Sequence, residues 1–148
     1  MLELGADLGR DDWRGSTALH YAAEKGNLEI LNLLLDKGVS TESKDMDGLT
    51  PLYMASRMGH LPGQLGAVKK LLEYGAQPDA KDNDGWTALH SAAEMNRGEA
   101  ALALIEAGAS CNAKNKDGDT PLHFAAGMGV TDVVRAPPAH PARPAAGR

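Results

Sequence analysis

A chain of 148 residues is long enough for one domain with its own core. Its charge argues against a nucleic-acid partner: residues 1–134 carry 20 acidic and 12 basic side chains, a net charge of −8, and phosphate binding needs clustered Lys and Arg. Its single cysteine, Cys111, excludes an intrachain disulfide and favours an intracellular location, either cytoplasm or nucleus.

The first nine residues, 1–9, have the pattern of the end of a structural unit. Leu2-Glu-Leu-Gly-Ala6 returns as Leu72-Glu-Tyr-Gly-Ala76 and as Ile105-Glu-Ala-Gly-Ala109. Residues 1–9 therefore indicate the closing half-turn of a repeat whose body is absent. Three explanations stay open, namely a truncated chain, an incorrectly placed start, or a piece of a longer protein.

Residues 10–44 predict two helices followed by a loop. Thr17 has the chemistry of a helix N-cap, because its hydroxyl can accept a hydrogen bond from a free amide of the first turn. Gly26 suits the left-handed position that ends this first helix. A second helix is predicted from about Leu28 to Asp36, where leucines recur at helical spacing. The following loop reaches Asp47-Gly48, a dipeptide suited to a tight hairpin turn.

The pattern around Thr17 returns three times along the chain. The equivalent threonines, Thr50, Thr87 and Thr120, follow at intervals of 33, 37 and 33 residues. A fixed period of this size predicts a stacked solenoid, in which each unit buries its apolar face against its neighbours. The four copies read Gly15-Ser-Thr-Ala-Leu-His20, Gly48-Leu-Thr-Pro-Leu-Tyr53, Gly85-Trp-Thr-Ala-Leu-His90 and Gly118-Asp-Thr-Pro-Leu-His123.

The second copy, residues 45–81, contains four extra residues at about 62–65. They lie in the turn between its two helices, and this turn contains Pro62, Gly63 and Gly66. Because proline and glycine break helices, we expect the insertion to bulge as a loop and not to lengthen a helix. It is either a contact element or an error in the gene model.

The last two copies differ in completeness. In residues 82–114, Asn96 replaces the helix-ending glycine, and asparagine is the next best residue in the left-handed conformation. In residues 115–136 a second helix begins, but Ala136-Pro-Pro138 stops it within two turns. Residues 137–148 are a Pro/Ala/Arg tail that we expect to be disordered.

At these motifs the chain resembles the ankyrin-repeat family over roughly residues 2–135. It carries the Gly-x-Thr-Pro-Leu-His core, the Ala22-Ala23 pair with its later copies, and the ending Leu71-Leu-Glu-Tyr-Gly-Ala76. The resemblance implies an all-α repeat solenoid of stacked helix-turn-helix repeats joined by β-hairpin loops, and a function in protein binding. The repeats would span 10–44, 45–81, 82–114 and, truncated, 115–136.

Histidine is a common metal ligand, and four histidines are candidates for this role. His20, His90 and His123 occupy one motif position, and His60 lies outside the pattern. Successive layers lie about 8–10 Å apart, too far to share one zinc ion at bonds of about 2 Å. We expect each motif histidine to bond to backbone and to its threonine, whereas Tyr53 replaces histidine in the second repeat and forgoes that bond.

No catalytic motif, phosphate loop or metal-ligand spacing is present, so we expect no enzyme activity, cofactor or metal. The acidic pairs recur with the repeat, and the preference of aspartate for turns indicates a structural role in the hairpins. These pairs are Asp45/Asp47, Asp82/Asp84 and Asp117/Asp119.

A stripe of exposed apolar residues is the best candidate for partner binding. Met58, Met95 and Met128 share one position in successive repeats, and the resemblance implies that this position faces the concave groove. Leu49 and Trp86 share another position, near the hairpin. Methionine adapts to partners and tryptophan often dominates binding energy. The alternative is that these residues pack between repeats. The predicted binding set is Trp13, Arg14, Lys25, Leu49, Arg57, Met58, Trp86, Glu94, Met95 and Met128, with Glu24 also on the polar rim.

Asn112 matches a loop asparagine that in this family can be hydroxylated, while the other repeats have Glu42 and Asp79 there. The alternative is an ordinary loop asparagine, a common turn residue.

The expected function is a protein–protein interaction module, such as a scaffold, adaptor or regulatory subunit, that binds a partner protein through its groove and hairpin tips. Neither secretion nor membrane insertion is indicated, because the sequence shows no signal peptide and no long run of apolar residues. One alternative is the substrate-recognition part of a larger enzyme, such as a kinase or ubiquitin ligase. Another is a truncated product without independent function. Partner identity and oligomeric state are not encoded in these motifs.

Overall fold

The computed structural model describes residues 8–59 and 61–128, and in these ranges the protein is an all-helical repeat solenoid. An isolated β-bridge joins Asp11 to Thr17, and the described loops contain no strand of greater length. The predicted fold class is therefore confirmed. The helices are α1 (Ala18–Lys25), α2 (Leu28–Asp36), α3 (Pro51–Arg57), α4 (Pro62–Glu73), α5 (Ala88–Glu94), α6 (Gly98–Glu106) and α7 (Pro121–Met128).

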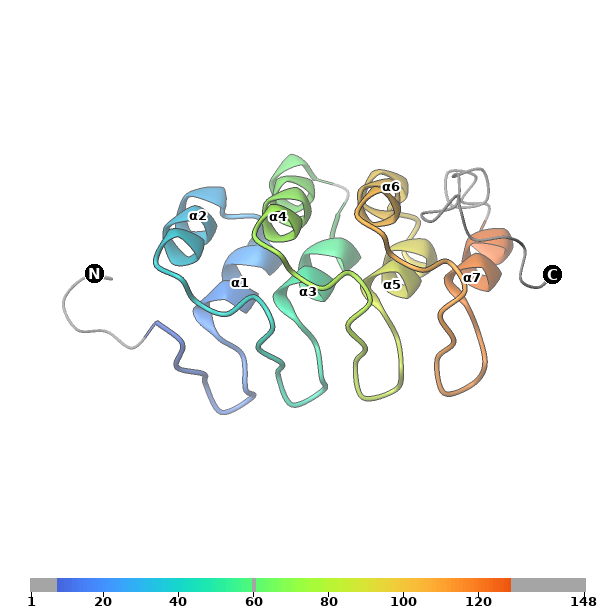
Figure 1. Ribbon diagram of the computed structural model, residues 1–148, viewed down its shortest axis with the longest axis horizontal. Coiled ribbons are helices and arrows are strands. Elements are labelled where there is room, and N and C mark those ends of the chain that lie inside the picture. Colours follow the sequence, from blue (N-terminus) through green and yellow to red (C-terminus); the bar gives the residue numbers. More distant parts are fainter. Residues whose placement is uncertain (1–7, 60, 129–148) are drawn as a thin grey trace.

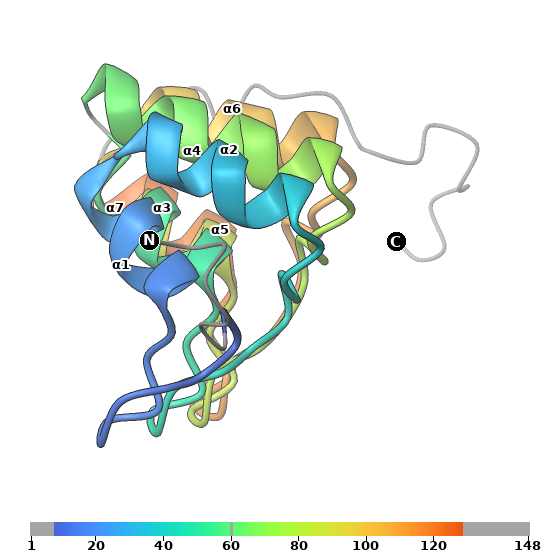
Figure 2. The same cartoon turned by 90° about the vertical axis from the view of Figure 1, so that its left-hand side faces the viewer.

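The helices form two layers, with the hairpin loops projecting from one side (Figure 1). Helices α1, α3, α5 and α7 pack in sequence to form the inner layer, and α2, α4 and α6 form the outer layer. Seen along the stack, the four loops lie behind one another (Figure 2). The face between the inner helices and the projecting loops is called the concave face below.

The motif threonines start the inner helices as predicted. The hydroxyl oxygens of Thr17, Thr50 and Thr87 accept hydrogen bonds from backbone N–H groups three residues later, at 3.4, 3.2 and 3.3 Å. Where proline follows, as at Pro51, it occupies the first helical turn, where a missing N–H costs nothing. At the other end, Asn96 adopts φ 59°, so it takes the left-handed conformation predicted for it.

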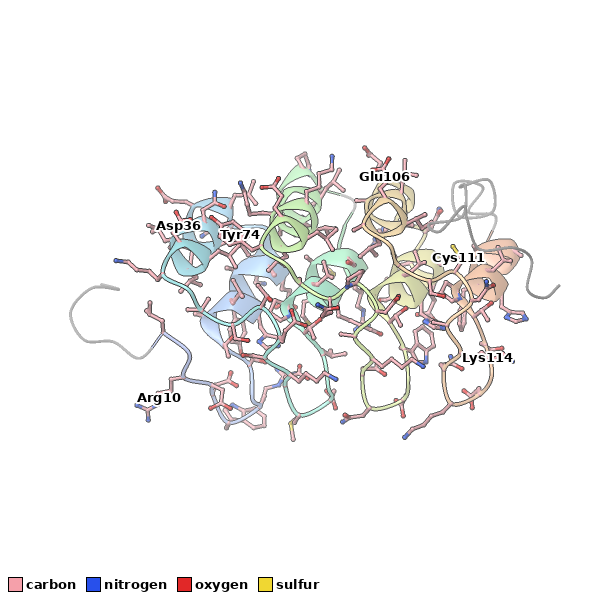
Figure 3. The ribbon with its side chains drawn as sticks, viewed as in Figure 1. Arg10, Asp36, Tyr74, Glu106, Cys111 and Lys114 are labelled. Atoms are coloured by element: carbon pink, nitrogen blue, oxygen red, sulfur yellow. The ribbon has the colours of Figure 1, made fainter. Side chains whose placement is uncertain are left out.

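The core is built mainly from leucine and alanine. The motif leucine of the inner helix is buried in the first three repeats, whereas Leu122 of the fourth is exposed, and the alanine pairs allow the two layers to approach closely. The outer layer is also linked by side chains: the Tyr74 hydroxyl donates a hydrogen bond to the Asp36 carboxylate, and the two residues face each other in Figure 3. The largest fully buried aliphatic side chains are Leu19, Leu31, Leu34, Leu52, Leu71, Leu89, Leu104 and Val68.

The insertion of the second repeat lengthens a helix, and the expectation of a bulging loop was wrong. Helix α4 has 12 residues, whereas α2 and α6 each have 9, and it begins at Pro62. Proline is well tolerated at this first position, and Gly63 lets the new helical turn lie directly against the backbone of Gly26. Gln64 is buried there, and its Nε2 donates to the Glu24 carbonyl at 3.0 Å.

Several predictions lie wholly or partly outside the described ranges. These concern most of the remnant 1–9, His60, the second helix of the fourth repeat and the tail 137–148. The four repeat boundaries likewise stay predictions. Within the ranges that the structure covers, no helix is both long and apolar enough to cross a membrane.

Candidate functional site

His20 and His90 each join the start of their inner helix to the backbone of the next repeat. Nδ1 of His90 accepts the Thr87 N–H at 3.1 Å, and its Nε2 lies 2.9 Å from the Asp119 carbonyl oxygen. His20 makes the same pair of contacts, with Thr17 N–H at 3.0 Å and Leu49 O at 2.7 Å. Because Nδ1 accepts, Nε2–H is the donor, and the neutral ring is fully satisfied. The structural interpretation of these two histidines is confirmed.

The neutral state of His90 makes stability depend on pH. Burial lowers the pKa of His90 below its ordinary value of 6.5. On acidification the unfolded chain therefore takes up the proton first, so this stabilisation is fully present above the ordinary pKa and is lost as pH falls through the folded pKa. We expect the urea midpoint to fall between about pH 7.5 and about pH 5.5. Urea titrations of His90→Gln should show a smaller fall, and an equal fall would contradict this origin.

The hairpin loops form a fixed row. In each of the four loops one side-chain oxygen accepts two backbone N–H groups of its own turn; for Asp82 these are Asp84 N at 2.8 Å and Trp86 N at 2.9 Å. Neighbouring loops are then joined by backbone hydrogen bonds, such as Asn83 N–H to Asp47 O at 3.1 Å. Asp45 and Asp82 thus have the structural role expected of the acidic pairs, whereas Asn115 takes that role in the loop of Asp117 and Asp119, and these bonds hold the loops in a defined arrangement. The other three acceptors are Asp12, Asp45 and Asn115.

A recess of about 300 Å³ opens on the concave face between α3, α5 and the loop that precedes α5. It combines aromatic, acidic and basic side chains from α3 with those of α5 and its preceding loop, which belong to the next repeat. Figure 1 shows these segments side by side in the middle of the stack. The lining residues are Tyr53, Arg57, Asp82, Asp84, Trp86, Ser91 and Glu94.

Tyr53 lies at the base of this recess and is 8% exposed. Burial, followed by the nearby Asp82 carboxylate, raises the pKa of Tyr53 to about 12, and Ser91 and Asp82 line the recess beside it. The phenol therefore stays neutral at physiological pH. The second repeat thus replaces the histidine clamp with a polar aromatic group that faces the groove.

Trp86 both packs between repeats and lines the recess. Its ring centroid lies 4.7 Å from that of Phe124 and 5.6 Å from that of His90, at tilted angles. The side chain is nevertheless only half-buried. One part of the Trp86 ring therefore packs between repeats, as the alternative interpretation predicted. The rest of the ring is exposed and accessible to a partner.

The other predicted binding residues are spread along the stack. Met58 and Met95 directly follow α3 and α5 and are half-buried, as is Leu49. Trp13 is 85% exposed, and the Arg14 guanidinium carbon lies 5.7 Å from its ring centroid. Lys25 is exposed at the end of α1. The side chain of Met128 lies outside the described part.

The recess brings together three residues of the predicted set, Arg57, Trp86 and Glu94. It adds Tyr53, Asp82, Asp84 and Ser91, which were not in that set. Tyr53 carried a usable signal, because it breaks the Thr-x-x-His series. Asp82 and Asp84 carried no such signal in the sequence, because the preference of aspartate for turns already accounted for them.

Asn112 is exposed in the loop after α6, and its backbone N–H donates to the Ser110 hydroxyl at 3.1 Å. Its hydroxylation stays a prediction. Over residues 8–59 and 61–128, no group of three His, Cys, Asp or Glu side chains is arranged to hold a metal ion.

Comparison with known proteins agrees with this architecture. A family model described as ankyrin repeats (3 copies) matches residues 1–82 and 63–136. The chain is 44% identical over 57 residues to inversin from Gallus gallus, and 50% identical over 60 residues to a fem-1 homolog A-like protein from Mus musculus. These alignments span 38% and 40% of this chain but only 5% and 9% of those relatives. The repeated motif, the two-layered helical stack and the family match together establish that the chain belongs to the ankyrin-repeat family.

Proposed function

We propose that this chain is a protein-interaction module, acting as a scaffold, adaptor or regulatory subunit, that binds a partner through its concave face and hairpin tips. Ankyrin repeats are generally protein-interaction modules. The observation that carries the proposal for this chain is the recess between α3, α5 and the adjoining loop. It offers partly exposed aromatic surface on a scaffold whose loops are already fixed by hydrogen bonds.

The surface around the recess has the composition of a protein interface. Half-buried Met58, Met95 and Trp86 supply adaptable and aromatic contact area. Exposed Arg57 and Glu94 supply a charged rim. Since the row of loops is held in place beforehand, a partner would lose little binding energy to ordering this surface.

A second candidate is the recognition part of a larger enzyme. The two relatives described above are far longer than this chain, since it covers 5% and 9% of their lengths. The same concave face would then select the substrate of a catalytic domain elsewhere. Sequencing full-length transcripts would separate the two candidates, because only the enzyme requires a catalytic domain in the same open reading frame.

The proposal is tested by peptide selection on the purified chain. Peptides selected from a phage-displayed library should bind Met58→Glu/Met95→Glu at least about tenfold more weakly than the parent, because each charge is placed in the apolar centre. The matched control, Leu33→Glu/Leu102→Glu, places the same charges on exposed outer-layer positions and should bind normally. Circular dichroism checks that both variants fold. Equal binding by the parent and the inner variant would refute the concave-face proposal.

A further inference from the structure

We propose that the recess receives the arginine side chain of an extended, basic segment of the partner protein. This inference rests on the proposed function and specifies its chemistry. The occupant is an arginine because the recess combines carboxylates that lack an ion-pair partner with the partly exposed ring of Trp86, and a guanidinium is the one protein side chain that is cationic, planar and rich in directed donors.

The recess carries a net negative charge. Asp82, Asp84 and Glu94 contribute −3 and Arg57 contributes +1, which leaves −2. The ion pair recorded in the described ranges joins Lys70 to Glu73 on the outer layer, so none of these three carboxylates is neutralised by a described cation. Across residues 1–134 the net charge is −8, which also favours the approach of a basic segment.

Arg57 lines the recess but forms no ion pair with its carboxylates in the described ranges, and two other nearby cations are directed elsewhere. Lys81 adjoins Asp82 in sequence, but its Nζ donates to the Lys114 carbonyl at 3.1 Å, towards the next loop. Arg97 points its Nε at the Arg57 carbonyl at 3.1 Å and does not line the recess. The carboxylates therefore remain available to an incoming cation.

Part of one aromatic ring is accessible in the recess. Trp86 is half-buried, whereas the ring of Tyr53 is buried and contributes a neutral phenol to the lining. A guanidinium can stack on an aromatic face while its edge donates to carboxylates. The recess, of about 300 Å³, is large enough to admit one long side chain.

The replacement of histidine by Tyr53 supports this assignment independently of charge. In the first and third repeats the motif histidine donates to the carbonyl that precedes the next motif threonine. The equivalent carbonyl here belongs to Trp86, and Tyr53 instead interacts with Ser91 and Asp82. The second repeat thus lacks this histidine contact, and the recess forms beside the tyrosine that replaces it.

The experiment is a nuclear magnetic resonance titration of the full chain with two short peptides. Both are acetylated, amidated and flanked by alanine and glycine; one has a central arginine and the other has citrulline, its neutral isostere. The arginine peptide should shift the Trp86 indole and Glu94 amide signals, and the citrulline peptide should leave them in place. Equal shifts with both peptides, or none with the arginine peptide, would overturn the proposal.

Substitutions then assign the effect to the recess. Asp82→Asn/Glu94→Gln should weaken arginine-peptide binding roughly five- to tenfold, since each partly exposed pair contributes a few-fold. The turn should survive, because Asn115 already performs the role of Asp82 in the next loop. Asp45→Asn makes the same change one repeat earlier, where the side chain does not line the recess, and should bind like the parent. If Asp45→Asn weakened binding of the arginine peptide equally, the overall charge of the protein would explain the loss, and the proposal that arginine binds in the recess would be refuted.

The two proposals fail separately. If binding of the library peptides depends on Met58 and Met95 but the peptides are not enriched in arginine, the interaction-module proposal is supported and the arginine proposal is refuted. If library peptides bind Met58→Glu/Met95→Glu as tightly as the parent, the concave-face proposal is refuted, and the arginine recess, which rests on it, is refuted as well.

Discussion

Replacing His90 with alanine should lower the free energy of unfolding by about 3 kcal/mol. The imidazole is fully buried and joins the start of α5 to the backbone of the next repeat. Alanine would leave a cavity and remove the acceptor of the Thr87 N–H and the donor to the Asp119 carbonyl. A buried donor or acceptor without a partner costs about 1–3 kcal/mol, and the lost packing adds to this. Urea unfolding followed by circular dichroism measures the change.

His123→Ala is the matched control, because it removes the same residue from the same motif position. The His123 side chain is exposed, although its Nδ1 also accepts the N–H of its threonine, Thr120, at 2.9 Å. We expect this variant to lose only about 1 kcal/mol, the value of an exposed helix cap. Similar losses in the two variants would mean that the clamp to the next repeat contributes little.

The features predicted correctly from sequence are those set by local chemistry. The start of each inner helix follows from a threonine whose hydroxyl caps its own first turn, so it repeats wherever the threonine does. The limits of α2, Leu28–Asp36, were predicted because glycine and leucine spacing mark them within a few residues. The left-handed conformation of Asn96 depends only on its own backbone.

The recess was predicted only in part because it is a tertiary feature. Arg57, Trp86 and Glu94 were selected as groove residues by their repeat positions. Asp82 was assigned to the turn, and its hydrogen bonds confirm that role, but the second use of the same carboxylate depends on Tyr53 from the preceding repeat. Sequence spacing does not report such a contact between repeats.

The insertion of the second repeat was predicted wrongly for a related reason. Local propensity treats proline and two glycines as helix breakers. In the structure Pro62 occupies the first helical position, and the lack of a side chain at Gly63 allows α4 to contact Gly26. The gain from packing between repeats outweighs the low helix propensity of glycine, which costs only about 1 kcal/mol.

Gly63→Ala should therefore destabilise the protein by about 2 kcal/mol, against the sign expected from helix propensity. A Cβ at Gly63 would lie 2.5 Å from the Gly26 carbonyl oxygen and 3.2 Å from its Cα, so two backbone segments would have to separate. Overpacking of this kind costs about 1–3 kcal/mol or more, whereas alanine in a helix gains only about 1 kcal/mol over glycine. Urea unfolding of the variant and the parent measures the balance.

Gly66→Ala separates the clash from propensity, because it makes the same substitution three residues further along α4. There a Cβ would approach only the Leu28 side chain, at 2.9 Å, and Leu28 is 37% exposed and free to rotate. We expect this change to be neutral or stabilising by up to about 1 kcal/mol. Stabilisation by both substitutions would mean that α4 does not lie against Gly26. Loss at Gly63 alone would establish that the inserted residues build the contact between the first two repeats.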